Sequence, residues 1–530
     1  TAKHQLPEGK RSGAHEWGFV AYRDGLLYGT ATIRKELAAR LRRRGRKTDD
    51  STDAIFAIDV ETGKQLWTYQ GKTIVHHTIA LGSDRVFFID STITSEERAA
   101  LLRQDKSELL KLKGEAAKIA ADRMKKIDAR TAVAIDGRSG KLLWSEPVDV
   151  TDCSEIGIGG GKLTMIYRDN TLVLCGANAN GHYWSQFIKG DFKRRRLVAL
   201  SASDGRKVWS KDANYRHRPI VIGQQIIAEP WSFDLKTGKQ KTRIHPLTGK
   251  EVPWSIIRPG HHCGMLTGCD NMLMFRSGYT GFYDLTGDSG TQHFAGHRLG
   301  CWINAIPANG LVTIPEASAG CVCLFSIAAT ITLEPREARR PWTIYSAVGD
   351  KTPVEHMRLN FGAPGDRKDA QGRLWLAYPR PAPRKVTSLD LPLSISEKFA
   401  TGGGFENRFS REVEIDKTET DWLYSCWAEG ITRFELPLLG KGDAPTKYTV
   451  RLHFAVVDED QSPKFEVKMQ GKSVLANFDP MAEAGGRGKA VVREFEGIAV
   501  TGKLVIELTG QSTDGKSSAL PILSAIEVIK

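Results

Sequence analysis

The sequence predicts an all-β protein: a β-propeller followed by a β-sandwich. Three segments of the chain align without a gap, AIFAIDVETGKQLW, TAVAIDGRSGKLLW and RLVALSASDGRKVW. In each segment apolar and polar residues alternate up to a glycine turn, and a tryptophan closes the second strand. Beyond residue 346 the sequence changes to many short alternating stretches with polar turns, which is typical of a sandwich.

The aligned segments each place a tryptophan four residues beyond a glycine. The pairs are Gly63 and Trp67, Gly140 and Trp144, and Gly205 and Trp209. Because one hairpin cannot bury its apolar face alone, such units are expected to stack around a ring. The pattern A-x-D-x-x-[TS]-G-K-x-x-W resembles the tryptophan-docking motif of the quinoprotein-type (PQQ-like) β-propeller family. The resemblance implies that these tryptophans are structural and stack between neighbouring blades.

The same resemblance does not imply a PQQ cofactor. The dehydrogenases of that family resemble one another in a pair of adjacent cysteines, and the nearest pair in this chain is Cys321 and Cys323. We therefore expect no cofactor and regard PQQ as disfavoured. No spaced metal-ligand motif is present, and a divalent metal held by imidazoles remains an alternative.

The propeller is expected over residues 1–345, with six to eight blades. The aligned segments stand further apart than the roughly 40 to 50 residues that one blade needs, so insertions separate them. One insertion, residues 95–129, is rich in Ala, Leu, Lys and Glu with charge pairs four residues apart, and predicts helix. The opening segment HEWGFVAYRDGLLYGTA predicts a strand pair already inside a blade. Two alternatives follow: an upstream domain or partner chain completes the ring, or the ring closes with fewer blades than its relatives have.

The second domain is expected over residues 346–530, after a connector that includes PRPAPR. Its strand-like segments run in the order YTVRLHFAVVDED, FEVKMQGKSVLANFDP, AVVREFEGIAV, LVIELTG and SAIEVI. This order closely resembles the malectin-like carbohydrate-binding jelly roll, and the resemblance covers about residues 354–530. It implies that the protein binds carbohydrate.

Basic residues exceed acidic ones, 75 against 62, and part of the excess is concentrated. Residues 34–47 hold eight basic residues and one acidic residue, and residues 193–196 form a second basic run. A basic surface indicates a polyanionic partner such as nucleic acid, anionic lipid or an acidic glycan, while a solvated insertion is the alternative. No nucleic-acid fold signature accompanies these runs, so no nucleic acid is expected. No apolar run approaches the length of a membrane span.

Eight cysteines are present, and their full connectivity cannot be derived from spacing. Cys263 and Cys269 bracket a short turn-like stretch, which favours a local disulfide in a secreted protein. Buried free thiols are the alternative. We expect a secreted or periplasmic protein.

Histidines and arginines stand just before the first strand of three predicted blades. Strands that occupy equivalent positions in a propeller begin on the same face, so these groups are expected to line a shared funnel. The alternative is that each one is satisfied locally at the rim. The residues are His76, His77, Arg216, His217, Arg218, His261 and His262.

Residues 258–323 add a second concentration of polar groups that are costly to bury. This stretch resembles a subgroup of large secreted bacterial PQQ-like proteins that share R-x-GCWINAIPA-x-GL-x-x-x-P-[DE]-A-[ST]-AGC-x-C. The candidate catalytic residues are His77, His217, His262, Arg276, His297 and Arg298. The candidate substrate-binding residues are His76, Arg216, Arg218, His261, Trp302, Asn304 and Glu316.

These observations favour a protein that binds or acts on acidic polysaccharide, with uronate or sulfate groups. One alternative is a polysaccharide lyase or hydrolase with its active site in the funnel, where Arg276 or Arg298 would neutralise a uronate carboxylate and a His or Tyr would remove the α-proton. Such an enzyme is favoured over a quinone-dependent dehydrogenase. The other alternative is a non-catalytic scaffold that binds protein partners.

Overall fold

The structure is a computed structural model of the 530-residue chain, and it divides into two compact units, Thr1–Gln240 and Lys241–Lys530. Each unit is described by itself. The described residues are 4–10, 13–46, 51–94, 96–97, 99–101, 111–125, 127–154, 162–176, 187, 189–190, 195–260, 262–294, 296–300, 303–316, 329–337, 342–381, 391–458, 463–511 and 520–530.

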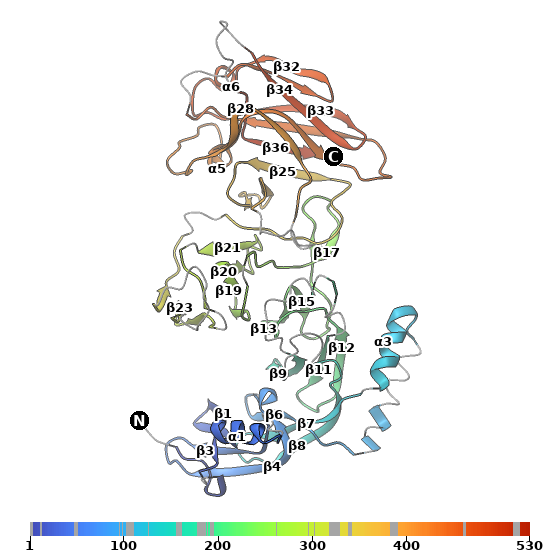
Figure 1. The fold of residues 1–530 in the computed structure, drawn as a ribbon, viewed down its shortest axis with the longest axis vertical. Helices are drawn as coiled ribbons and strands as arrows, with labels where there is room; N and C mark the ends of the chain where they lie inside the picture. The colour runs from blue at the N-terminus through green and yellow to red at the C-terminus, as the bar shows by residue number, and fades with distance from the viewer. Residues whose placement is uncertain are drawn as a thin grey trace. The chain divides into compact units, whose positions relative to one another are not determined.

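The first unit is a series of antiparallel blades whose strands follow one another in chain order (Figure 1). A single residue pair, Ile74 with Asp90, joins the first blade to the second. The fourth blade gains an isolated bridge between Phe233 and Gln240. The strands are β1 (His15–Arg23), β2 (Leu26–Ile33), β3 (Ser51–Asp59) and β4 (Gln65–Val75); β5 (Ala80–Leu81), β6 (Arg85–Asp90), β7 (Ala129–Asp136) and β8 (Leu142–Asp149); β9 (Leu163–Arg168), β10 (Thr171–Gly176), β11 (Arg196–Ser201) and β12 (Lys207–Asp212); β13 (Ile220–Ile222), β14 (Gln225–Ala228) and β15 (Trp231–Asp234).

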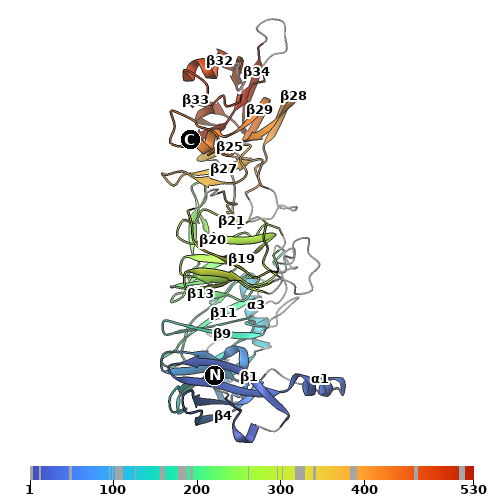
Figure 2. The ribbon, with the colours of Figure 1, turned by 90° about the vertical axis from the view of Figure 1, so that its left-hand side faces the viewer.

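Helices in this unit are insertions between strands. The helix α1 (Lys35–Arg43) separates β2 from β3 and buries none of its residues, and Figure 2 shows it standing out from the strands. The helix α3 (Gly114–Lys125) lies within the insertion predicted over residues 95–129. The two short 3-10 turns are η1 (Glu8–Lys10) and η2 (His76–Thr78).

Both faces of the central strand β3 are apolar, and each face packs in an apolar cluster of its own. On β3, Ile55 and Ala57 belong to the core shared with the second blade, whereas Phe56 and Ile58 face the other side. Alternation at a period of two places these residues on opposite faces of one strand. A blade can therefore pack against a neighbour on each side.

A tryptophan links each of the first three blades to the next. The indole N–H donates to the backbone carbonyl that follows the third strand of the next blade. The bonds are Trp67 to Gly137 (3.1 Å), Trp144 to Ala202 (3.0 Å) and Trp209 to Leu235 (3.1 Å). The repeat in the sequence thus corresponds to a repeated contact between blades.

The second unit begins with the hairpin β16 (Thr242–Ile244) and β17 (Glu251–Pro253), followed by two further blades. With the four blades of the first unit, six blades of three or four strands lie within the described residues. The strands of the two blades are β18 (Thr267–Cys269), β19 (Met272–Ser277), β20 (Tyr279–Asp284) and β21 (Thr291–Phe294), and then β22 (Ile306–Ala308), β23 (Leu311–Ile314) and β24 (Ile331–Leu333).

A β-sandwich of two six-stranded sheets completes the second unit, and the predicted all-β class is confirmed (Figure 2). One sheet has the order β26-β27-β25-β36-β30-β33, and the other has β28-β29-β34-β31-β32 with β35 beside β29. The elements are β25 (His356–Phe361), β26 (Arg367–Lys368), β27 (Leu374–Tyr378), β28 (Ser396–Asn407), α5 (Asp421–Tyr424), β29 (Cys426–Pro437), β30 (Thr446–Phe454), β31 (Phe465–Met469), β32 (Lys472–Phe478), α6 (Pro480–Ala484), β33 (Val491–Val500), β34 (Lys503–Gly510), β35 (Ile522–Leu523) and β36 (Ala525–Ile529).

The sandwich core receives a residue from the hairpin that opens the second unit. Leu247 is buried in the same apolar cluster as Leu359 and Ile526, and its carbonyl accepts the backbone N–H groups of Glu355 and His356. Within this unit the hairpin and the sandwich therefore share one core. The domain boundary expected at residue 345 stays a prediction.

Candidate functional site

The residues that connect successive blades of the first unit lie at one edge of its strands. The register pairs His15 with Ile33 and Ser51 with Val75, so these four strand ends share an edge. The helix α1 follows Ile33 closely, and His76 follows Val75 directly. The basic helix and the paired histidines therefore leave the first blade at the same edge.

His76 is held in a narrow slot against the first blade. Its Nε2 lies 2.9 Å from the Thr30 hydroxyl oxygen, which itself accepts the Phe19 backbone N–H. The Thr30 hydroxyl is then free to donate its proton to a neutral imidazole. Burial and the neighbouring His77 lower the pKa of His76. A β-carbon on Gly18 would stand only 2.9 Å from the His76 ring, so the slot tolerates no larger residue.

His77 and Arg218 come from different connecting segments and influence each other. His77 is exposed, and its pKa is lowered first by partial burial and then by the charge of Arg218. Arg218 is half-buried just before β13. The first unit thus brings together two of the predicted groups, an imidazole and a cation.

Arg216 and His217 face the interior instead. The Arg216 Nη1 atom lies 3.0 Å from the Glu229 Oε1 atom, with both side chains 3% exposed, and His217 Nε2 lies 3.9 Å from Glu229 Oε2. The Arg216 backbone N–H also donates to the Glu229 carbonyl. Arg195 donates to the carbonyls of Tyr215 and Arg216. Glu229 also belongs to this group, and no sequence pattern pointed to it.

In the second unit, Arg276 and His297 both neighbour Thr280. Arg276 is the cross-strand neighbour of Thr280, whose hydroxyl lies 3.0 Å from His297 Nδ1. His297 is 2% exposed, burial lowers its pKa, and its Nε2 has no hydrogen-bond partner among the described residues. Asn304 lines the same small hollow as Arg276, and that hollow has no room for a water molecule.

The remaining predicted residues are spread over the second unit. His262 lies before β18, with its Nδ1 2.7 Å from the Gly260 carbonyl, and Arg298 is 9% exposed. The backbone N–H of Glu316 donates to the Thr330 hydroxyl. His261 and Trp302 lie outside the described residues. A site shared by all three connecting segments stays a prediction, because its members come from both units.

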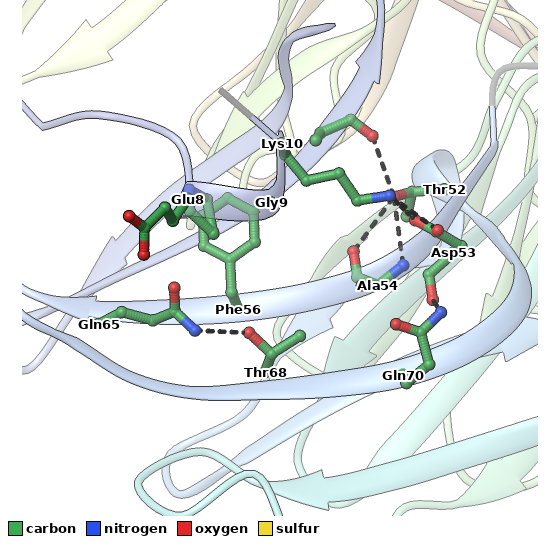
Figure 3. A pocket seen from close by; sticks show the side chains of 12 residues that line it. Glu8, Gly9, Lys10, Thr52, Asp53, Ala54, Phe56, Gln65, Thr68 and Gln70 are labelled. Atoms are coloured by element: carbon green, nitrogen blue, oxygen red, sulfur yellow. Dashed lines mark hydrogen bonds and ion pairs between the residues drawn. The ribbon is translucent and has the colours of Figure 1, made fainter. Parts of the chain in front are cut away.

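A pocket of about 410 Å³ lies on the first blade, and none of the predicted residues is among those that line it (Figure 3). Lys10 and Asp53 form an ion pair of 2.8 Å in its wall, and the hydrogen bond from Lys10 lowers the pKa of Asp53. Gln65 donates to the Thr68 hydroxyl at 2.8 Å. Amide, hydroxyl and charged groups around an aromatic ring, Phe56, suit a small polar ligand. No sequence motif marks this pocket.

Cys263 and Cys269 are not joined, so the local disulfide expected between them is wrong. Cys263 is buried before β18, whereas the exposed Cys269 ends that strand with its Sγ 3.9 Å from the Met272 carbonyl. Across the described ranges, no three His, Cys, Asp or Glu side chains are grouped closely enough to hold a metal ion. None of the described helices combines the length and the apolar character that crossing a bilayer requires.

Two segments of the chain match known protein families. Residues 24–241 match the PQQ-like repeat family described as "Outer membrane protein assembly factor BamB", and residues 396–526 match the malectin domain. The predicted pairing of a PQQ-like propeller with a malectin-like domain is therefore confirmed. No curated protein matches the chain.

Solved structures with some similarity include a β-glucuronidase 2 from Bacteroides uniformis, 11% identical, with a TM-score of 0.27 over 63% of this chain and 27% of the other. They also include the plant receptor-like kinase FER, 20% identical, with a TM-score of 0.24 over 33% of this chain and 42% of the other. The ANXUR2 extracellular domain from Arabidopsis thaliana is 18% identical, with a TM-score of 0.24 over 33% and 41%. The chain thus spans well under two thirds of each of these proteins.

Proposed function

We propose that this protein, which joins a PQQ-like repeat segment to a malectin domain, binds acidic polysaccharide as a secreted or periplasmic protein. The malectin domain makes it a carbohydrate-related protein. That the glycan is acidic goes beyond the family match and is part of the proposal. The positive charge of one exposed helix supports it.

The helix α1 and the residues just after it carry cations that no carboxylate of the described residues neutralises. None of these side chains is in an ion pair, and the helix buries none of its residues. A compact cluster of positive charges attracts a polyanion and so raises the local concentration of that polyanion near the surface. The cations are Arg40, Arg42, Arg43, Arg44 and Arg46.

The described half of the second basic run, Arg195 and Arg196, differs from α1, while residues 193 and 194 lie outside the described residues. Arg196 is buried and its Nη1 lies 2.6 Å from Asp149 Oδ2, while Arg195 is buried and donates to two carbonyls. These two arginines hold blades together rather than facing a partner. The exposed arginines of α1 thus lie at the edge that also carries His77.

Binding rather than catalysis is the function we propose. Arg276 and His297 would be the pair suited to a lyase, yet both are 2% exposed, and the hollow beside Arg276 cannot hold a water molecule. A sugar ring is much larger than water. The burial of these two groups therefore supports binding over catalysis.

The test compares retention on a column of immobilised heparin, a sulfated uronate polymer, as the salt concentration rises. Exchanging Arg42, Arg43 and Arg44 for glutamine should lower the salt concentration of elution. Screening shortens the range of charge interactions from about 10 Å at 0.1 M salt to about 3 Å at 1 M. The parent protein should therefore bind at low salt and elute as salt rises.

A matched control removes the same charge from the opposite edge of the strands. Lys64, Lys141 and Lys239 lie in the exposed turns of three blades, and exchanging them for glutamine changes the net charge equally. This control should elute with the parent. Equal losses in both triple variants would mean that only net charge matters, which contradicts a role for α1.

A further inference from the structure

Two indole rings and one guanidinium meet on the sandwich. The Arg367 Cζ atom lies 4.6 Å from the centre of the Trp422 ring and 5.5 Å from that of Trp342. The two indoles stand edge to face, with centres 5.8 Å apart and planes at 80°. The three residues come from β26, from α5 and from the segment before the sandwich, so folding alone brings them together.

The guanidinium of Arg367 has no hydrogen bond and no ion pair with any described residue. It is half-buried, and burial lowers its pKa, with only the charge of Asp421 acting in the opposite direction. A guanidinium stacked on aromatic rings keeps its N–H donors at its rim, where they can bind a planar anion. The indole N–H groups of Trp342 and Trp422 also have no acceptor among the described residues.

The backbone fixes these groups in place. Thr343 and Asp366 form an isolated bridge, with each backbone N–H donating to the other residue's carbonyl at 2.8 and 2.7 Å. Their chain neighbours Trp342 and Arg367 are thereby tied to each other. Asp366 is itself anchored, because its carboxylate accepts the backbone N–H groups of Tyr345 and Ala377 and pairs with Arg380. A preorganised group loses less entropy when a ligand binds.

Two other arginines of the sandwich, Arg358 and Arg408, have their anions supplied by the chain. Arg408 stacks over Trp427 at 5.3 Å, much as Arg367 stacks over its indoles, but it also pairs with Glu406 at 3.1 Å and with Asp458 at 2.5 Å. Arg358 pairs with Glu527. Arg367 therefore differs from them, because its stacked guanidinium is paired with no carboxylate of the described residues.

We propose that Arg367, Trp342 and Trp422 form a subsite for a uronate residue of the acidic polysaccharide. The guanidinium would bind the sugar carboxylate through two parallel N–H···O bonds. The half-buried Trp342 offers a ring face for the apolar C–H groups of the sugar, and the Asp421 carboxylate can accept a sugar hydroxyl. This subsite rests on the proposed function and names the sugar class that the sandwich would recognise.

The experiment measures binding of a defined galacturonate oligomer to the full chain by calorimetry and by tryptophan fluorescence. Arg367→Gln should weaken binding by about tenfold or more, because the charged hydrogen bonds to the sugar carboxylate would be lost. Arg367→Lys keeps the charge but loses the two-pronged geometry, so an intermediate loss is expected. Trp342→Ala should reduce both the affinity and the fluorescence change.

Arg408→Gln is the matched control, because it removes a stacked arginine whose anions are already present. It should bind the oligomer as the parent does. Thermal unfolding of every variant checks the fold, and Arg367→Lys serves as the test if Arg367→Gln does not fold. Parent-like affinity in the folded Arg367 variants would overturn the subsite, as would an equal loss in Arg408→Gln. Heparin retention that still depends on α1 would then show that the proposed function stands without this subsite.

Discussion

The indole ring of Trp67 occupies the space in which a β-carbon on Gly140 would stand. Such a carbon would lie 2.7 Å from the ring, and Gly140 has a φ of +68°, a conformation that favours glycine. The same contact joins Trp144 to Gly205 of the following blade. The glycine of each turn is thus required both by its backbone and by the tryptophan that covers it.

Gly140→Ala should destabilise the first unit more than a substitution that only strains the backbone. A left-handed alanine costs about 1–2 kcal/mol, and displacement of the Trp67 ring adds to it. Gly25→Ala is the matched control, because Gly25 has a φ of +81° with nothing within 4 Å of the added carbon. Thermal unfolding measures both, and equal losses would contradict a steric role for the indole.

Trp144→Ala should cost roughly 3–5 kcal/mol, as large-to-small changes at packed sites do. The variant loses the contact with Gly205 and the hydrogen bond to the Ala202 carbonyl. Denaturant unfolding measures the difference. An unchanged midpoint would show that this tryptophan does not hold two blades together.

Glu229→Gln should destabilise the protein by about 3–5 kcal/mol, because Arg216 would keep a buried charge without its carboxylate. Glu61→Gln, in an exposed turn, is the control and should change stability little. If the two variants unfold alike, Arg216 is solvated in a way that its 3% exposure does not suggest.

Stability should fall as the pH drops below about 6.5. Burial lowers the pKa of His453 to about 4, and its ring lies against Trp375 with Nδ1 2.9 Å from the Tyr424 hydroxyl. The unfolded chain takes up this proton near pH 6.5 and the folded chain only near pH 4, so acid favours unfolding. The loss from this one histidine approaches about 3 kcal/mol by pH 4.

Unfolding midpoints from pH 7 to pH 4 measure this dependence. His453→Asn should lower the stability at pH 7 but reduce its fall with acid. Burial also lowers the pKa of His245 and His293 to about 4, so part of the slope should persist in the variant. An identical slope in the parent and the variant would contradict the buried, neutral state of His453.

Local patterns in the sequence predicted the repeated turns, the helical insertion and the sandwich, because each rests on neighbours along the chain. A further tryptophan, Trp254, follows Gly249 by five residues instead of four, and its indole N–H donates to the Asp288 carboxylate at 2.8 Å. Asp288, with a φ of +45°, provides the positive φ that glycine has in the other turns.

Contacts between residues that are far apart in the chain could not be predicted from local sequence patterns. Glu229 follows Arg216 with no motif between them, and Arg367 meets Trp422 only because a strand and a short helix are packed together. The spacing of Cys263 and Cys269 suggested a disulfide, whereas both cysteines are free, one of them buried and the other exposed. The burial of each arginine also could not be predicted from the sequence. Burial decides whether an arginine can bind a ligand or instead stabilises the core.

The most direct test of acidic-glycan recognition compares one polymer in two chemical forms. The full chain is titrated with a galacturonate oligomer and with the same oligomer after its carboxyl groups have been reduced to alcohols, each at low and at high salt. We predict tighter binding of the acidic form, with an affinity that falls as salt rises, and weak, salt-independent binding of the reduced form. Equal affinity for the two forms would contradict the central claim.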